Sequence, residues 1–299
     1  DGGLVIYDIP ENEIENVKWD GTEKTKYNQF VWIPVEVNKA TEPKDTETSI
    51  ASFKRNVWQD NARVANNAQS STSFPSTSSS AWSNYSEPNI TNDTATGIAS
   101  QIENLTKSIY KYGGFYIGRY EAGSETERTG ASRTKVTPIG IKQDMYPYNN
   151  VKWGESMSNI GEVGAVALSN SLYNSEAKPN YGATSMLCTG ACWDSMLDFI
   201  KDEEHNVTNS TEWGNYYNSE YKVYRGIVYR NSAWSLADVT NGTEITKNKG
   251  ILLTTGAATE RNSAKNIYDV AGNCYEWTTE SRSSDFRVRR GRLLRRRWL

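Results

Sequence analysis

The apolar positions of residues 93–112 follow the period of an α-helix. Isoleucine and leucine recur at spacings of four, three and four residues, at Ile98, Ile102, Leu105 and Ile109. This spacing places the four side chains on one face of a helix, and the Gly113-Gly114 pair that follows is typical of a helix end. The pattern therefore predicts an amphipathic helix over these residues.

Shorter patterns predict the remaining elements. Two strands are expected, at residues 28–37 and 115–121, and two further helices, at residues 161–173 and 190–202. Pro34 favours an edge position or a bulge for the first strand, and Thr189 is a suitable N-cap for the last helix. Short strands are also expected near residues 221–230, 250–254 and 274–279. Together these elements indicate an α+β fold with few helices and many long loops, which commonly carry function.

Residues 66–92 differ from their surroundings in composition. Nine serines fall between residues 70 and 86, and no charged residue occurs in that stretch. Such a segment, rich in Ser, Thr and Asn, is typical of a flexible surface insertion. We expect residues 1–291 to form one domain that carries this insertion, since one core can support a chain of that size.

Charge is distributed unevenly along the chain. The 299 residues have a formal net charge of −3, but residues 282–299 contain eight arginines and one acid, Asp285. A basic tail on an acidic body is compatible with nucleic-acid or membrane-surface binding. The tail lacks the interleaved aromatic residues of a nucleic-acid platform, so nucleic acid is not an expected partner. No run of about 18 apolar residues occurs, so we expect membrane attachment only through a leader outside this sequence, which begins at Asp1.

Cysteine and histidine are too sparse to suggest familiar chemistry. Cys188, Cys192 and Cys274 lack the further Cys or His residues that a zinc site needs, and we interpret them as free thiols. The single histidine, His205, lies in a polar loop without the partners of a catalytic triad. We expect it to be a surface residue.

Four segments of the chain resemble the formylglycine-generating-enzyme/sulfatase-modifying-factor family. They are residues 113–123 (GGFYIGRYEAG), 147–153 (PYNNVKW), 185–200 (SMLCTGACWDSMLDFI) and 266–278 (NIYDVAGNCYEWT). The last is the most specific, because it follows the family pattern N-x-Y-D-M-x-G-N-V-W-E-W-T nearly position by position. The resemblance implies the irregular α+β fold of this family, a relative of C-type lectins, with small antiparallel sheets and long loops.

The subgroup that the chain resembles consists of surface or prophage-encoded proteins of Gram-positive gut bacteria. Some relatives of this fold are variable proteins of diversity-generating retroelements, whose loops are diversified to bind ligands. The resemblance thus implies an extracellular or cell-surface domain, in some cases phage-encoded, that recognises a protein or glycan on a cell or phage surface. A structural component of a pilus or phage tip is the alternative.

An oxidase of the formylglycine-generating type is a further alternative. Catalytic members of the family use a cysteine pair near the C-terminus to bind copper, and no cysteine follows Cys274 in this chain. The thiolate ligands that copper requires are therefore absent. We expect a non-enzymatic domain without copper.

Calcium is the cofactor that the resemblance implies. Family members bind it at the turn corresponding to residues 269–276, and the matching ligands are Asp269, the backbone carbonyls of Gly272 and Cys274, and Glu276. Hard oxygen donors from one turn suit calcium. In the alternative interpretation, Asp269 and Glu276 only accept hydrogen bonds from nearby amides.

The same turn lies among aromatic residues that are candidates for a ligand-binding surface. These candidates are Trp213, Tyr216, Tyr275 and Trp277. Trp and Tyr combine a large contact area with a polar group, which suits recognition. Core positions for Trp277 and Trp193 are the alternative, because most large aromatic side chains are buried.

Residues 292–299 do not resemble the family. If Arg290–Leu299 is written in suitable codons and one G is deleted, the segment reads Arg-Gly-Gly-Tyr-Tyr followed by glycines, which resembles an ordinary family continuation. We therefore hypothesise that this Arg-rich tail arises from a frameshift. A nucleic-acid-binding tail and a solvated tail without a role are the competing interpretations.

Overall fold

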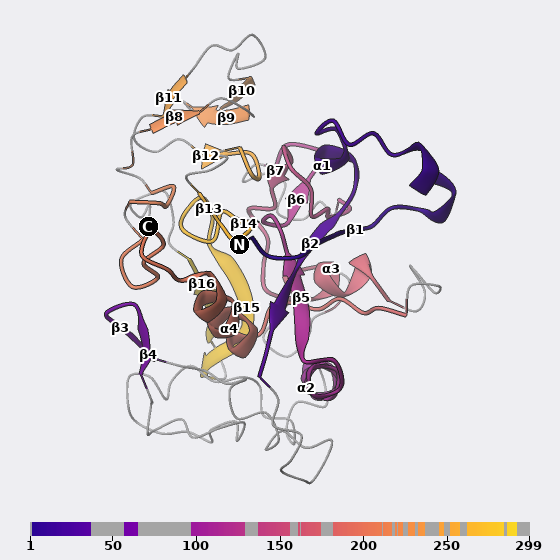
Figure 1. The fold of residues 1–299 in the computed structure, drawn as a ribbon, viewed down its shortest axis with the longest axis vertical. Coiled ribbons are helices and arrows are strands. Elements are labelled where there is room, and N and C mark those ends of the chain that lie inside the picture. The colour runs from indigo at the N-terminus through magenta and orange to yellow at the C-terminus, as the bar shows by residue number, and fades with distance from the viewer. Residues whose placement is uncertain are drawn as a thin grey trace.

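The fold was taken from a computed structural model (Figure 1). It describes residues 2–36, 57–64, 97–128, 137–155, 161, 163–174, 182–210, 212–216, 219, 221–223, 227–230, 233–236, 245–247, 252–257, 262–283 and 286–291. The expected insertion at residues 66–92 and the Arg-rich tail at residues 292–299 lie outside these residues. Within them, no helix is both long and apolar enough to cross a bilayer.

Helices are few and strands are short. The helices are the 3-10 helix η1 (Glu11–Asn16), α1 (Glu23–Lys26), α2 (Ile98–Tyr112), α3 (Ala165–Leu172) and α4 (Gly190–Ile200). The strands are β1 (Val5–Tyr7), β2 (Gln29–Pro34), β3 (Val57–Gln59), β4 (Ala62–Val64), β5 (Gly114–Gly118), β6 (Gly123–Ser124), β7 (Tyr146–Pro147), β8 (Tyr221–Val223), β9 (Ile227–Arg230), β10 (Ala233–Leu236), β11 (Ile245–Lys247), β12 (Leu252–Leu253), β13 (Ser263–Ala264), β14 (Ile267–Tyr268), β15 (Glu276–Ser283) and β16 (Phe286–Arg290).

A three-stranded antiparallel sheet in the order β1-β2-β5 organises the N-terminal half. In β2, Gln29, Val31 and Ile33 are buried and the residues between them are half-buried, because successive side chains of a strand point to opposite faces. The expected edge position of β2 is wrong, since the strand is central. Pro34 is tolerated there because it is the last residue of β2 and lies beyond the pairing with β1, which reaches only Val31.

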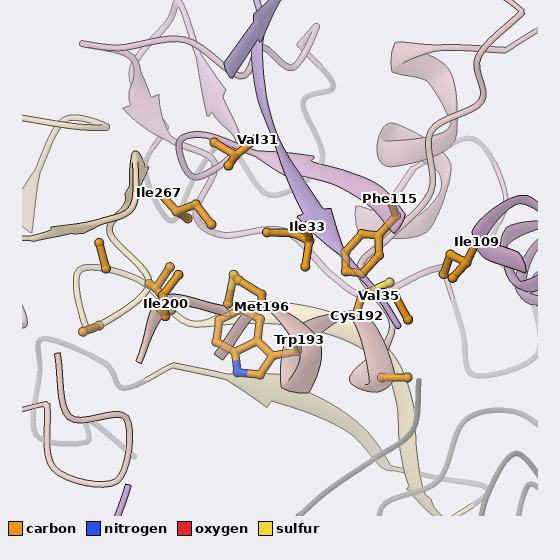
Figure 2. Close-up of a cluster of buried hydrophobic side chains, with 14 of the residues drawn as sticks. Val31, Ile33, Val35, Ile109, Phe115, Cys192, Trp193, Met196, Ile200 and Ile267 are labelled. Atoms are coloured by element: carbon orange, nitrogen blue, oxygen red, sulfur yellow. The ribbon is translucent and has the colours of Figure 1, made fainter. Parts of the chain in front are cut away.

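The inner face of this sheet packs against α4. Figure 2 shows the main core cluster, to which the sheet contributes Val31, Ile33 and Phe115, and α4 contributes Trp193, Met196 and Ile200. The predicted N-cap is confirmed, because the Thr189 side chain accepts a hydrogen bond of 3.0 Å from the Cys192 amide. Since α4 contacts both β2 and β15, it joins the central sheet to the C-terminal hairpin.

The predicted amphipathic face of α2 is also present. Its buried residues are divided between two clusters, because Ile109 joins the main core while Ile98 and Ile102 pack with Trp153 and Leu187. The helix ends before Gly113, whose φ of 80° is left-handed and suits glycine. This helix therefore holds the two cores together.

The remaining strands form small antiparallel sheets of two or three strands. The short strands expected near residues 221–230 are present as β8 and β9, which belong to different sheets. α3 is shorter than predicted and begins after Gly164, whose φ is 136°. The described residues thus have the expected α+β class with few helices and small antiparallel sheets.

Candidate functional site

The turn between β14 and β15 carries the four predicted calcium ligands. Asp269, Gly272 and Asn273 within it have positive φ angles of 61°, 93° and 58°. Gly272 also lies against Asn215, whose backbone a Cβ atom at this position would strike. Glycine is therefore required here both for the left-handed backbone and for the close approach.

Asn273 connects this turn to three other segments. Its side chain is fully buried, and its Oδ1 accepts hydrogen bonds from the Leu253 amide at 3.1 Å and from Asn215 Nδ2 at 2.9 Å. Its Nδ2 donates to Glu121 Oε2 at 2.7 Å. A buried amide with satisfied donors and acceptors fixes the conformation of the chain around it.

Glu121 was not among the residues predicted for this site. It follows β5, is 9% exposed, and accepts a second hydrogen bond, of 3.1 Å, from the Cys274 amide to Oε1. Its pKa is raised well above the usual range by burial and then by the charge of Asp269. The only sequence signal was its position in the segment GRYEAG, which by itself does not distinguish it from a surface glutamate.

Asp269 has one occupied and one unoccupied carboxylate oxygen. Oδ2 accepts a hydrogen bond of 2.6 Å from the Gly256 amide, whereas Oδ1 is buried and has no hydrogen-bond partner among the described residues. Burial raises the pKa of Asp269 to about 7, against the opposing effect of the Gly256 hydrogen bond. The Asp269 side chain thus has both features considered for it: Oδ2 accepts a hydrogen bond from a nearby amide, and Oδ1 is left without a partner in the described residues.

Glu276, the first residue of β15, contains the second unpartnered oxygen. Its Oε2 is buried without a hydrogen-bond partner in the described part of the chain, and it lies 2.5 Å from where a Cβ of Gly291 would be. Burial raises the pKa of Glu276 well above its ordinary value, and the charge of the neighbouring Glu121 raises it further. Glu121 and Glu276 are therefore near enough for the charge of one to act on the other.

These observations test whether the turn fits calcium. No group of three or more His, Cys, Asp or Glu side chains in the described ranges is arranged to hold a metal ion. The predicted set contains only two carboxylates, because its other two ligands are the carbonyls of Gly272 and Cys274. Two buried carboxylate oxygens without partners are the donors that a hard cation prefers. The donor chemistry of the turn therefore suits calcium.

Two of the four predicted aromatic residues lie on one exposed surface. Tyr275 is 36% exposed, and Trp277 is half-buried, packs on the second core cluster and donates to the Val151 carbonyl at 3.0 Å. The guanidinium of the exposed Arg289 lies 5.0 Å from the Tyr275 ring and 5.1 Å from the Trp277 ring. Sequence reasoning missed Arg289, because it belongs to a run of arginines with no local sign of which one is stacked.

The other two predicted aromatic residues are not on this surface. Trp213 is 5% exposed and belongs to the main core, where its Nε1 donates to the Asn206 carbonyl at 3.1 Å. We therefore withdraw Trp213 from the ligand-binding set, since a buried ring cannot contact a ligand. Tyr216 packs against the same core and shares a hydrogen bond with the Ser210 hydroxyl.

His205 and the cysteines have surroundings that the sequence did not indicate. His205 is less exposed than expected, because its ring packs edge-on against Trp213 at 5.2 Å and its Nδ1 lies 2.8 Å from Asp202 Oδ1. None of the three cysteines forms a disulfide. Burial, followed by the charge of Glu121, raises the pKa of the Cys274 thiol well above its ordinary value, which disfavours the nucleophilic thiolate.

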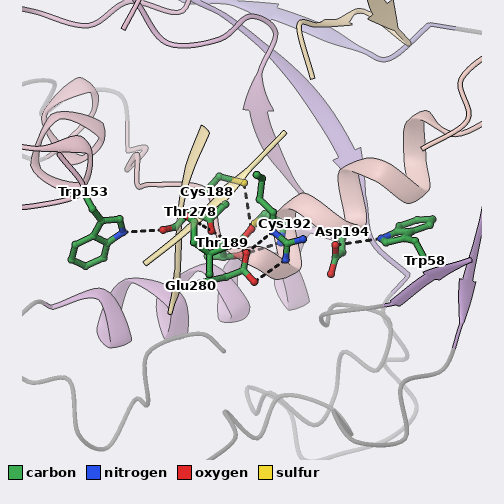
Figure 3. Close-up of polar contacts among 10 residues, drawn as sticks. Trp58, Trp153, Cys188, Thr189, Cys192, Asp194, Thr278 and Glu280 are labelled. Carbon is green, nitrogen blue, oxygen red and sulfur yellow. Dashed lines mark hydrogen bonds and ion pairs between the residues drawn. The ribbon is translucent and has the colours of Figure 1, made fainter. Parts of the chain in front are cut away.

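The four segments that carry the family resemblance converge on the strand after the turn. Glu121 accepts from the Cys274 amide, Trp153 Nε1 donates to the Thr278 carbonyl at 2.9 Å, and the Thr279 amide donates to the Cys188 carbonyl at 3.0 Å. Figure 3 shows Trp153, Cys188 and Thr278 in this polar network. Segments far apart in the sequence thus support one short region of chain.

No family model, curated protein or solved structure matches this chain. The resemblance to the formylglycine-generating-enzyme family therefore stays a prediction. What the site can do must be argued from its own residues.

Proposed function

We propose that this chain is a non-catalytic ligand-recognition domain in which a cation-stabilised turn supports an exposed surface of Tyr275, Trp277 and Arg289. The observation that carries the proposal is the position of Arg289 beside two aromatic rings, with no side-chain interaction to an acid in the described residues. Its guanidinium donors are available to a carboxylate or another anionic group. Trp, Tyr and Arg are also the residues that dominate binding hot spots.

The neighbouring arginines of β16 support this assignment by contrast. Arg290 forms an ion pair of 2.8 Å with the fully buried Glu280, and the Arg287 guanidinium stacks 4.0 Å from the Trp153 ring. Both serve packing within the fold, whereas Arg289 is exposed. We therefore expect a ligand that presents an anionic group beside an apolar face.

A cation at the turn would be held by Asp269 and Glu276 and by the carbonyls of Gly272 and Cys274. Both carboxylates have a buried oxygen without a partner among the described residues. Calcium there would neutralise the acidic side chains and favour one conformation of the turn. Since Tyr275 is the residue directly before Glu276, this turn positions the surface that would contact the ligand.

The sequence resemblance supports the rest of the proposal. We propose that the α+β fold is of the C-type-lectin-like type, because the four resembling segments converge on the turn and β15. The same resemblance supports an extracellular or cell-surface setting and a partner on a cell or phage surface. The absence of a C-terminal cysteine pair and the raised pKa of Cys274 support a domain without oxidase activity.

Binding to arrays of acidic oligosaccharides, neutral oligosaccharides and acidic peptides, in buffer with calcium, tests the function. We expect the wild-type chain to bind acidic probes, and Arg289→Ala to weaken that binding by about tenfold or more. Lys107→Ala is the matched control, because Lys107 is an exposed cation on α2 that pairs with Glu103. Equal effects of the two substitutions, or no binding of any acidic probe, would contradict the proposal.

A further inference from the structure

We propose that Glu121 is a positioning residue for the cation-binding turn, and that it couples a cation bound there to the segment after β5. This inference rests on the proposed function, because it concerns the same turn. Glu121 is 152 residues from Asn273 and 153 from Cys274 along the chain, yet its two carboxylate oxygens accept hydrogen bonds from those two consecutive residues.

The two hydrogen bonds hold the part of the turn that matters for a cation. The bond from the Cys274 amide fixes the peptide between Asn273 and Cys274, and the bond from Asn273 Nδ2 fixes the side chain that anchors the turn to Leu253 and Asn215. The predicted ligands Gly272 and Cys274 flank this residue and would use their carbonyl oxygens. Fixing Asn273 and the Cys274 amide therefore restricts the stretch of backbone between those two carbonyls.

Glu121 also adds an acidic group near the two predicted carboxylate ligands. It is close enough to Glu276 for its charge to act on that residue, and Asp269 is close enough for its charge to act on Glu121. Asp269 is 1% exposed, and its Oδ1 has no partner among the described residues. Groups that hydrogen-bond and orient metal ligands from outside the ligand set commonly change metal affinity by about 10–100-fold when removed.

Calcium titration of four proteins tests this role: the wild-type chain, Glu121→Gln, Glu276→Gln and Glu23→Gln. Glu23 is the matched control, because it is also a buried glutamate (6% exposed) whose carboxylate accepts a backbone hydrogen bond, from Gly21 at 2.7 Å. Calorimetry with calcium chloride measures affinity, and melting temperatures with calcium or EDTA measure stability. We expect Glu121→Gln to weaken calcium binding by about 10–100-fold, Glu276→Gln to abolish it, and Glu23→Gln to leave it unchanged.

Hydrogen exchange gives a readout that a purely structural role would not change. Calcium should slow exchange of the Cys274 amide, which donates to Glu121, in the wild-type chain and in Glu23→Gln but not in Glu121→Gln. If Glu121→Gln binds calcium as tightly as the wild type while Glu276→Gln does not, the inference fails and the proposed turn survives. If the wild-type chain binds no calcium, both fail.

Glu121→Asp covers the case in which Glu121→Gln does not fold. This variant keeps the charge and withdraws the carboxylate by one methylene, so we expect weakened calcium binding in a folded protein. If neither variant melts cooperatively even with calcium, Glu121 serves the fold rather than the turn, and the inference is overturned.

Discussion

Two glutamates of β15, Glu276 and Glu280, have opposite surroundings. Glu280 is fully buried and accepts two hydrogen bonds of 2.8 Å from Arg290 and a third, of 2.9 Å, from the Thr278 hydroxyl. Glu276 instead lies near Glu121, whose charge raises its pKa, and has a buried oxygen without a partner in the described chain. One carboxylate is neutralised by an arginine of the same hairpin, and the other is held against further acids.

This difference separates a residue of the fold from a residue of a site. A buried carboxylate in a bidentate pair with arginine needs nothing from outside the chain. A buried carboxylate beside other acids destabilises the folded state unless a proton or a cation neutralises it. A single strand thus has one glutamate whose charge the chain itself neutralises and one that is suited to an external cation.

Breaking the ion pair between Glu280 and Arg290 should have the largest effect on stability. Arg290→Met leaves Glu280 buried without its cation, and we expect a loss of about 3–5 kcal/mol in the free energy of unfolding. Arg289→Met, the same substitution at the exposed neighbour, should change it by less than about 0.5 kcal/mol. Urea unfolding of both variants measures the difference. Equal losses would mean that the Glu280 pair has no special role in the hairpin.

The backbone of the turn should give the next largest effect. Gly272 has a φ of 93° and no room for a Cβ atom beside Asn215, whereas Gly113 has a φ of 80° with nothing within 4 Å of an added Cβ. Alanine at Gly272 combines left-handed strain with a clash, so we expect a loss of about 3 kcal/mol. Alanine at Gly113 should lose only about 1 kcal/mol. Thermal unfolding of the two variants measures these losses. A larger loss for alanine at Gly113 than at Gly272 would contradict the prediction.

Local patterns along the sequence could predict much of this fold. The spacing of isoleucines placed the C-terminal end of α2, which spans Ile98–Tyr112 within the predicted 93–112, and the Thr189 cap placed the start of α4. Both signals depend on neighbours within one helical turn. The central position of β2 could not be predicted in this way. Which strands pair is decided by contacts between distant segments, and a terminal proline is compatible with either arrangement.

The same limit applies to the candidate site. Asp269 and Glu276 lie on one short turn, so their segment could be identified from the motif that contains them. Glu121 enters from more than 150 residues away, and no local pattern marks a glutamate as the buried acceptor of a distant amide. Trp213 was misassigned for a similar reason, since its polar loop gave no sign that the ring packs into the core.

Removing the acid at Glu276 should have a smaller effect on stability, in the opposite direction. In calcium-free buffer near pH 7, Glu276→Gln removes a buried acid whose pKa is raised by burial and by Glu121. We expect the free energy of unfolding to increase by about 1 kcal/mol, since one unit of pKa difference corresponds to about 1.4 kcal/mol. Chemical denaturation in EDTA measures it. The prediction is wrong if Glu276→Gln destabilises the calcium-free protein as Arg290→Met does.

The exposed acid Asp202 should have the smallest effect on stability, in contrast to the buried Glu276 and Glu280. Burial acts to raise the pKa of Asp202, but its hydrogen bonds with His205 prevail and lower it below the ordinary value of 3.8. Because its pKa is lower in the folded state, Asp202 stabilises the protein above pH 3.8, and this contribution disappears as the pH falls through the folded-state pKa. Asp202 is 43% exposed, so solvent screening should limit the contribution to less than about 0.5 kcal/mol. Asp202→Asn should therefore lower the urea midpoint slightly at pH 6, and this difference should shrink as the pH falls below 3.8. A loss of constant size across this range would assign the effect to the shape of the loop, because the charge of Asp202 diminishes as the pH falls.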